Sequence, residues 1–136
     1  MEHCIFTAVR KANRVLFRHY QEALADTGVS IVQLSILRAL ERHGDLPLSR
    51  LADELAMDRT SLYRTVEPLV EIGAVNVESA HTGRSKIAKL TPFGQVTIER
   101  VMPFWAQAQK RVLEEVAPEV RSDFQLALTS ILRLSN

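Results

Sequence analysis

Residues 48 to 94 constrain the fold of this chain most, because helical, turn and hairpin patterns follow one another there without a gap. Ser49 and Asp58 are expected to begin two short helices, since their side-chain oxygens can accept hydrogen bonds from the unpaired amides of a first turn. Gly73 is expected to end the second helix, because glycine readily adopts the left-handed conformation that closes a helix. Two alternating runs then predict a hairpin with a polar tip: Ala74–Glu78 and Lys86–Leu90. This order of elements predicts a helix-turn-helix followed by a wing, which suits the grooves of duplex DNA.

Two helices are expected before this segment. Apolar residues recur at helical spacing between Ile5 and Leu24. Ser30 and Gln33 form a capping-box pattern at the start of the next helix, and Gly44 is placed to end it. The winged segment therefore follows an N-terminal helical region.

A second helical region is expected after the hairpin. Thr91 followed by Pro92 predicts a helix start, and the apolar pattern continues to about Val116. Pro103 lies inside this run and should kink it, because proline removes a backbone donor. Pro118 is expected to open a last helix. The expected fold class is mainly α (α+β).

Composition indicates a folded chain in a reducing compartment. Of the 136 residues, 46% are hydrophobic, which is enough for a core, and the single cysteine excludes an internal disulfide framework. No apolar run approaches the roughly 18 residues of a membrane span, and the N-terminus lacks the charge order of a secretory signal, so we expect a cytoplasmic protein. The 17 basic residues nearly balance the 16 acidic ones, so net charge does not by itself favour nucleic acid as a partner.

The second helix of the motif separates into two faces at 100° per residue. Leu62, Val66, Leu69 and Val70 are expected to pack inward. Glu67 and Glu71 lie toward the C-terminal end, where we expect them to face away from DNA that meets the first turns. The exposed N-terminal half consists of five side chains that suit DNA: Arg59, Thr60, Ser61, Tyr63 and Arg64. Arginine can bind guanine or phosphate through two hydrogen bonds, and hydroxyls reach phosphates or base edges.

The hairpin carries its own basic cluster. Arg84 lies at the tip beside Gly83, and Lys86 and Lys89 follow in the second strand. Arg84 is placed to extend into a minor groove or along the DNA backbone. For a single basic loop residue the alternative is an arginine that is simply solvated.

These motifs resemble the MarR family of winged helix-turn-helix transcriptional regulators. The matching runs are LSRLADEL, DRTSLYRTVEPLVEIGAV and GRSKIAKLTPFG, together with the upstream QLSILRALERHG. The resemblance is good between about Val32 and Gly94 and covers the terminal helices only by length and apolar pattern. It implies a DNA-binding lobe at residues 30–91 of a single MarR-like chain, with dimerisation helices at 1–28 and 92–136.

The resemblance also implies partners and roles. It implies a homodimer on a pseudo-palindromic operator in double-stranded DNA, and a small aromatic effector at the junction of the dimer and DNA-binding regions that relieves repression. The major-groove contacts would be Arg59, Thr60, Ser61, Tyr63 and Arg64, and the wing contacts Arg84 and Lys86. Family wings commonly carry an acidic residue before the arginine, but here His81-Thr82-Gly83 precedes it. Pro68 inside the recognition helix is expected to distort it locally rather than break it.

Other functions have weaker support in the sequence. Cys4 would be a redox sensor if its thiol were reactive, as in one branch of the family. Phe17, Tyr20 and Trp105 would line an effector pocket, although core or dimer packing is the more usual role of apolar residues at helical spacing. The four histidines show no metal-ligand spacing, and no catalytic motif or cofactor-binding loop is present, so we expect neither an enzyme nor a metal or cofactor. A winged-helix module that binds another protein instead of DNA is the main alternative.

Overall fold

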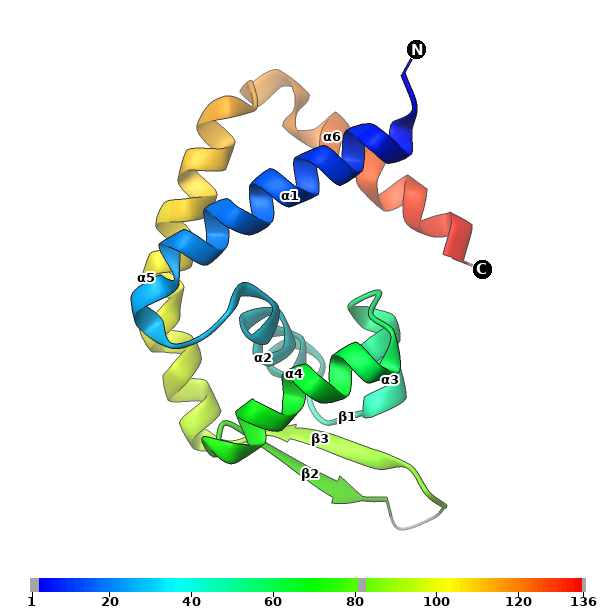
Figure 1. Ribbon diagram of the computed structural model, residues 1–136, viewed down its shortest axis with the longest axis vertical. Helices are drawn as coiled ribbons and strands as arrows, with labels where there is room; N and C mark the ends of the chain where they lie inside the picture. The colour runs from blue at the N-terminus through cyan, green and yellow to red at the C-terminus, as the bar shows by residue number, and fades with distance from the viewer. Residues whose placement is uncertain (1–2, 81–82, 136) are drawn as a thin grey trace.

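A computed structural model of the chain describes residues 3–80 and 83–135. Its elements form a winged lobe with two helical arms above it (Figure 1). Short 3-10 turns follow α1 at Ala25–Thr27, precede α6 at Pro118–Val120 and end the chain at Leu132–Ser135. The helices and strands in chain order are α1 Ile5–Ala23, α2 Ile31–His43, β1 Leu46–Pro47, α3 Leu48–Glu54, α4 Arg59–Glu71, β2 Val75–Ser79, β3 Lys86–Leu90, α5 Pro92–Glu115 and α6 Arg121–Ile131.

The winged lobe contains α2, α3, α4 and a three-stranded antiparallel sheet of order β1-β3-β2. Its core is apolar and fully buried at Leu37, Leu51, Leu62 and Leu69. Ile98 of α5 packs in the same core, so the long helix is anchored in the lobe. The predicted winged helix-turn-helix fold class is confirmed.

The start of α5 is held against the end of the recognition helix. The Thr91 hydroxyl accepts a hydrogen bond from the Gly94 amide at 2.9 Å and donates one to the Gly73 carbonyl at 2.6 Å. The predicted Thr91-Pro92 helix start is thus confirmed, and the helix continues without interruption through Pro103 to Glu115. One continuous element therefore connects the wing to the upper part of the molecule.

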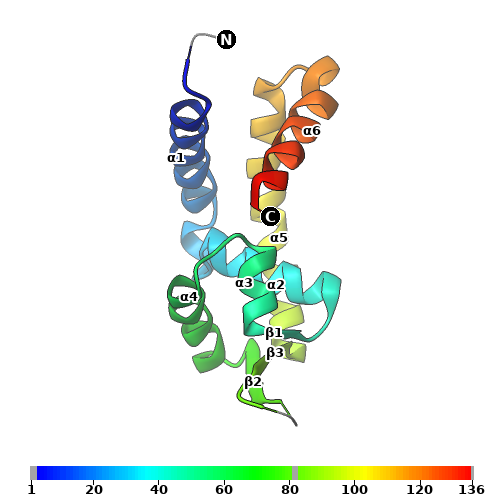
Figure 2. The same ribbon diagram turned by 90° about the vertical axis from the view of Figure 1, so that its right-hand side faces the viewer.

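The upper part of the molecule is formed by α1, the second half of α5, and α6. Figure 2 shows α1 on one side and the second half of α5 with α6 on the other, above the winged lobe. A small second core of Leu24, Val29, Leu34 and Val101 joins α1 and α5 to α2. Beyond that core neither α1 nor α6 contains a fully buried residue.

Several local predictions need correction. Ser49 does not cap α3, because the helix begins at Leu48 after Pro47, whose extended backbone pairs with β3. The last helix does not open directly at Pro118, since a 3-10 turn precedes α6. Val70 was expected to be buried but is 40% exposed, because the core contacts only the Leu62, Val66 and Leu69 side of α4.

Most helix ends lie where the sequence predicted them. Ser30 and Gln33 form the reciprocal capping box of α2, and Gly44 ends that helix with a positive φ of 77°. Asp58 caps α4, and Gly73 follows its end with a φ of 81°. Within the described ranges, no helix is long and apolar enough to cross a membrane.

Candidate nucleic-acid interface

The N-terminus of α4 is fixed by the Asp58 cap. The Asp58 carboxylate accepts a hydrogen bond from the Ser61 amide and another from the Ser61 hydroxyl, both at 2.8 Å. The Ser61 amide, followed by its hydroxyl, lowers the pKa of the Asp58 carboxyl. Ser61, a predicted DNA contact, is exposed, but its hydroxyl already donates a hydrogen bond to the Asp58 cap.

A tight turn sets the direction of α4 relative to α3. The Met57 amide donates to the Ala52 carbonyl at 2.9 Å, and the Ala56 amide donates to the Asp53 carbonyl at 3.2 Å. Ala56 takes a positive φ of 51°, a conformation that L-residues other than asparagine and aspartate seldom adopt. These hydrogen bonds fix the conformation of the turn between α3 and α4.

The buried and exposed sides of α4 are clearly separated. Leu62, Val66 and Leu69 are buried against the lobe. The side chains predicted to contact DNA are all exposed: Arg59, Thr60, Ser61, Tyr63 and Arg64. The structure thus presents the N-terminal half of α4 as a polar surface with two arginines and three hydroxyl groups.

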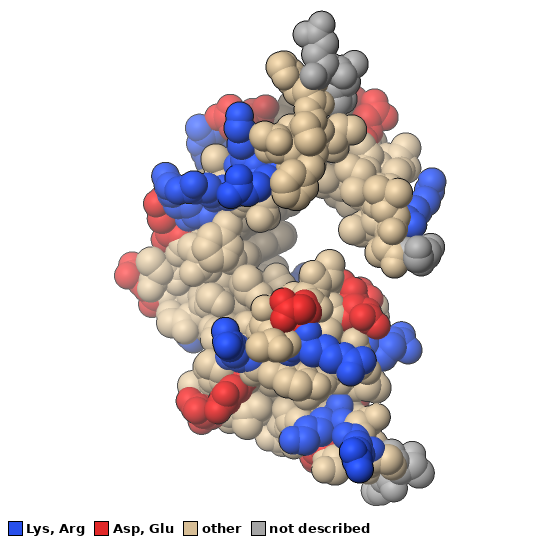
Figure 3. Space-filling model, turned by 45° about the vertical axis from the view of Figure 1, so that its right-hand side comes forward, with Lys and Arg blue, Asp and Glu red and all other residues tan. Residues whose placement is uncertain are grey.

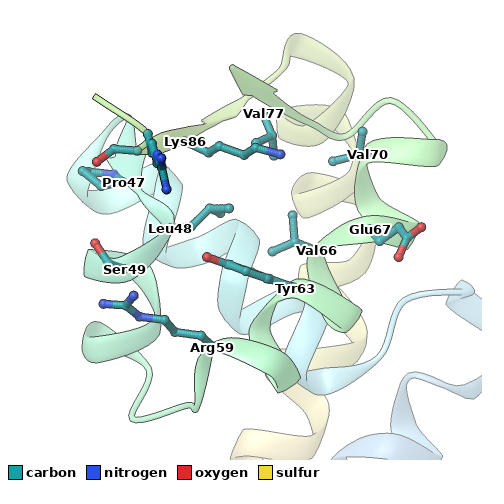
Figure 4. Close-up of a pocket in the computed structure, with 12 residues that line it drawn as sticks. Pro47, Leu48, Ser49, Arg59, Tyr63, Val66, Glu67, Val70, Val77 and Lys86 are labelled. Atoms are coloured by element: carbon teal, nitrogen blue, oxygen red, sulfur yellow. The ribbon is translucent and has the colours of Figure 1, made fainter. Parts of the chain in front are cut away.

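An open groove of about 660 Å³ lies between α4 and the wing. Tyr63 extends across it toward α3, between Arg59 and Leu48 (Figure 4). Arg84 and Lys86 contribute from the wing side. Four of the seven predicted contacts therefore line one groove, whereas Thr60, Ser61 and Arg64 lie on α4 outside it.

The groove also contains residues that the sequence did not single out. Ser49, which was expected only as a cap, contributes a hydroxyl from α3. Val70 and Val77 add apolar surface, and Glu67 adds a carboxylate that the sequence placed away from the DNA. A pattern of buried residues along α4 could not reveal this, because the wing and α3 decide which exposed face becomes a groove wall.

The basic side chains of the interface are available to a ligand. Figure 3 shows basic residues gathered over the winged lobe, apart from a second group on the upper helices. Among the described residues, none of Arg59, Arg64, Arg84 or Lys86 takes part in an ion pair. A surface with exposed, unpaired cations and hydroxyls attracts phosphate groups.

Lys89 has a different role from its basic neighbours. Its ammonium lies 3.1 Å from Glu78 on β2 and 3.9 Å from Asp45 in the loop before β1. The hydrogen bond to Glu78, more than the charge of Asp45, raises the pKa of Lys89. Lys89 thus links the two wing strands to the body of the lobe.

His81 and Thr82, where the family pattern places an acidic residue before the wing arginine, lie outside the described residues.

The predicted effector residues are only partly brought together. Tyr20 and Trp105 pack against the same small core, and the Tyr20 hydroxyl donates a hydrogen bond to the side-chain oxygen of Gln109. Phe17 is 49% exposed and does not join them. Trp105 borders a small cavity of about 250 Å³ between α2 and α5, with Arg38 and Arg42 at its edge.

Cys4 lies at the start of α1 and is exposed. Its side chain completes no capping hydrogen bond, but the nearby Thr7 amide, then the Thr7 hydroxyl and the Phe6 amide, lower the pKa of the thiol. In the described part of the chain, no three His, Cys, Asp or Glu side chains gather into a metal site.

Comparison with known proteins agrees with this geometry. A model of the IclR helix-turn-helix domain matches residues 33–79, which run from α2 to the end of β2. No curated protein sequence matches the chain significantly. The family model thus covers the helix-turn-helix but not the terminal helices.

Solved structures resemble the chain over almost its whole length. The DNA complex of the M. tuberculosis transcriptional regulator MosR is 27% identical, with a TM-score of 0.82 over 98% of this chain and 96% of MosR. Bordetella bronchiseptica BpsR, whose DNA binding 6-hydroxynicotinic acid regulates, is 20% identical, with a TM-score of 0.85 over 96% and 94%. A mutant of E. coli MarR bound to operator DNA is 18% identical, with a TM-score of 0.83 over 94% and 93%. The chain is therefore a DNA-binding winged helix-turn-helix regulator with the fold of the MarR family.

Proposed function

We propose that the chain is a homodimeric, sequence-specific repressor that inserts α4 into the major groove and is released from DNA by a small ligand. The observation that carries the proposal is the groove between α4 and the wing, with its exposed cations on both walls. A cationic groove beside an exposed polar helix face suits a DNA strand whose phosphates enter the groove while base edges meet the helix.

The two faces of α4 divide the contacts into two kinds. We assign Arg59 and Tyr63 to the phosphate backbone, because they line the groove together with Arg84 and Lys86. We assign Thr60 and Arg64 to base edges, because they are exposed on α4 outside the groove. Phosphate contacts mainly determine affinity and salt dependence, whereas base contacts determine sequence preference.

Exposed apolar surface on the helical arms supports the dimer. Phe6 is 72% exposed on α1 and Phe124 is 49% exposed on α6. An apolar groove of about 640 Å³ between α1, α5 and α6 is lined by Val15, Leu16, Val112 and Phe124. Contiguous apolar surface of this kind marks an interaction site, and a second copy offers the same apolar arms in return.

A ligand that relieves repression is supported by the cavity beside Trp105. It lies between α2 of the winged lobe and α5, with Arg38 and Arg42 at its edge. A planar organic anion matches an indole ring beside guanidinium groups. BpsR, whose DNA binding 6-hydroxynicotinic acid regulates, has the same fold.

DNA binding tests the proposal directly. Duplexes are first enriched from a randomised pool with the wild-type protein, and the affinity for the best duplex is measured by fluorescence anisotropy at several salt concentrations. Arg64→Ala is expected to weaken this affinity by about 1–3 kcal/mol, the value of a good base contact. Arg84→Ala is expected to lower the affinity for all duplexes by a similar factor. It should also reduce the slope of log affinity against log salt concentration by about one, the contribution of one phosphate contact.

Arg14→Ala is the matched control, because Arg14 is an exposed arginine on α1, away from the groove. It should leave the affinity unchanged. Unchanged affinity for both Arg64→Ala and Arg84→Ala would reject this docking. A wild-type protein without salt-dependent affinity for duplex DNA would instead favour a winged-helix module that binds a protein partner.

A further inference from the structure

Glu67 is an acid in a groove whose other charged lining residues, among those that the structure describes, are cationic. It lies on the Val66 side of this groove, away from Arg59, which we assign to the phosphate backbone (Figure 4). It lines the space between α4 and the wing together with Arg59, Arg84 and Lys86. Figure 4 shows its side chain beside Val66, pointing away from Arg59. It is exposed, and within the residues that the structure describes it forms no ion pair.

Helix geometry places Glu67 on the same side of α4 as the side chains that we assign to base edges, but nearer the C-terminus. Thr60 and Glu67 are seven residues apart, so at 100° per residue they point within about 20° of each other. The rise of 1.5 Å per residue separates them by about 10 Å along α4, or about three base-pair steps. Arg64 lies between them on the same exposed side. If Thr60 and Arg64 enter the major groove, Glu67 faces base pairs farther along it.

A carboxylate can bind only certain groups of DNA. It repels phosphates, and because it is acceptor-only it cannot hydrogen-bond the acceptor atoms of guanine or thymine. The major groove offers it two amino donors, N4 of cytosine and N6 of adenine. Adenine places the acceptor N7 beside N6, and a carboxylate oxygen is repelled there, whereas cytosine presents its amino group without an acceptor of its own.

We propose that Glu67 is a specificity-determining residue that accepts a hydrogen bond from the N4 amino group of a cytosine in each half-site. This inference rests on the proposed function, because it takes α4 to lie in the major groove. The bond forms at the third turn of α4, and it makes a cytosine preferred at one base pair by about 5- to 100-fold over the other bases.

Selection from a randomised duplex pool tests the role of Glu67. The wild-type protein, Glu67→Ala and Glu67→Gln are used in parallel, and the enriched duplexes are sequenced. Wild-type half-sites are expected to contain one cytosine whose preference disappears with Glu67→Ala, while the other positions keep theirs. Glu67→Gln is expected to shift this position toward adenine, since an amide offers both a donor and an acceptor to N7 and N6. Anisotropy with single base-pair changes at this position then measures the loss of the 5- to 100-fold preference.

Glu71→Ala is the matched control, because Glu71 is an exposed acid on the same helix that does not line the groove. It removes the same charge, so any general gain in affinity is common to both alanine variants, whereas the base preference should change only with Glu67. Identical preferences at every position for the wild type and Glu67→Ala would overturn the inference, even if affinity rises. If the wild type enriches no sequence, the proposed function itself fails and this inference with it.

Discussion

Gly94 shows at the residue scale why the end of the wing tolerates no side chain at one position. A Cβ on Gly94 would lie 2.6 Å from Leu90 Cδ1 and closer still to the Ala74 carbonyl oxygen. Because the Ala74 carbonyl belongs to the backbone, α5 itself would have to move. Glycine is needed here for close approach and not for its φ.

Gly94→Ala is therefore expected to lower the free energy of unfolding by about 1–3 kcal/mol, as overpacking does. Urea denaturation measures this change. Gln107→Ala, on the exposed side of the same helix, should stay within about 0.5 kcal/mol of the wild type. Equal stability of the two variants would contradict the close packing of Gly94 on the Ala74 carbonyl and Leu90.

Ala56 carries strain in the turn between α3 and α4, where its φ is 51°. An L-residue in the left-handed region costs roughly 1–2 kcal/mol, and glycine adopts it freely at the expense of greater entropy in the unfolded chain. Ala56→Gly is expected to raise the free energy of unfolding by about 0.5–1 kcal/mol in a urea titration. Ala106→Gly, in the helical interior of α5, should lower it by a similar amount. A loss of stability in both variants would show that the turn is not strained.

Helix caps decide the geometry of the recognition surface at the element scale, and the Asp58 cap makes α4 sensitive to acid. The folded protein lowers the pKa of Asp58 from 3.8, so its stabilising effect is complete above that value and is lost as the pH falls through the lower folded pKa. The stability difference between the wild type and Asp58→Ala should thus be constant near neutral pH and shrink below about pH 4.

Urea titrations across this range measure the effect of the cap. Asp58→Asn is the control, because asparagine also caps helices but does not titrate there. It should keep most of the stability at neutral pH and show less dependence on acid. A wild-type advantage over Asp58→Ala that persists unchanged into strong acid would reject the charged cap.

Sequence reasoning at this scale succeeds where the cause is local. Ser30, Asp58 and Thr91 were predicted as caps and cap their helices, because capping needs only a short polar side chain before a helical run. The prediction that Ser49 caps α3 was wrong, because a tertiary contact, the pairing of Pro47 with β3, accompanies a helix start two residues earlier, with Pro47 in the cap position. The prediction that Val70 is buried was wrong, because its side of α4 faces the groove and not the core.

At the scale of the whole molecule, the main feature is that α1 and α6 contain no fully buried residue and lie outside the winged lobe. Figure 3 shows the surface hollowed between the lobe and these arms. Two copies that bury their apolar arms together would place two α4 helices for two half-sites, which couples dimerisation to DNA affinity.

Phe124→Glu is expected to weaken the dimer, because it places a charge in the apolar groove of α1, α5 and α6. Sedimentation velocity at micromolar concentration should show a wild-type dimer and a larger monomer fraction for the variant, with weaker binding of a two-half-site duplex. Gln125→Glu adds the same charge at an exposed neighbouring position and should remain dimeric. A wild-type monomer at every concentration would reject the dimer, and circular dichroism checks that Phe124→Glu keeps its helices.

The sequence by itself determined the winged helix-turn-helix, the ends of most helices and the exposed half of α4. These features follow from caps, turns and apolar periodicity, which act over a few residues. Only the tertiary structure decided that the wing and α3 form a groove with Arg59 and Tyr63, that Lys89 pairs with two acids, and that Glu67 lines the groove. The reason is physical: periodicity states which side of a helix leaves the core, but the segments packed beside that helix decide what its exposed side faces.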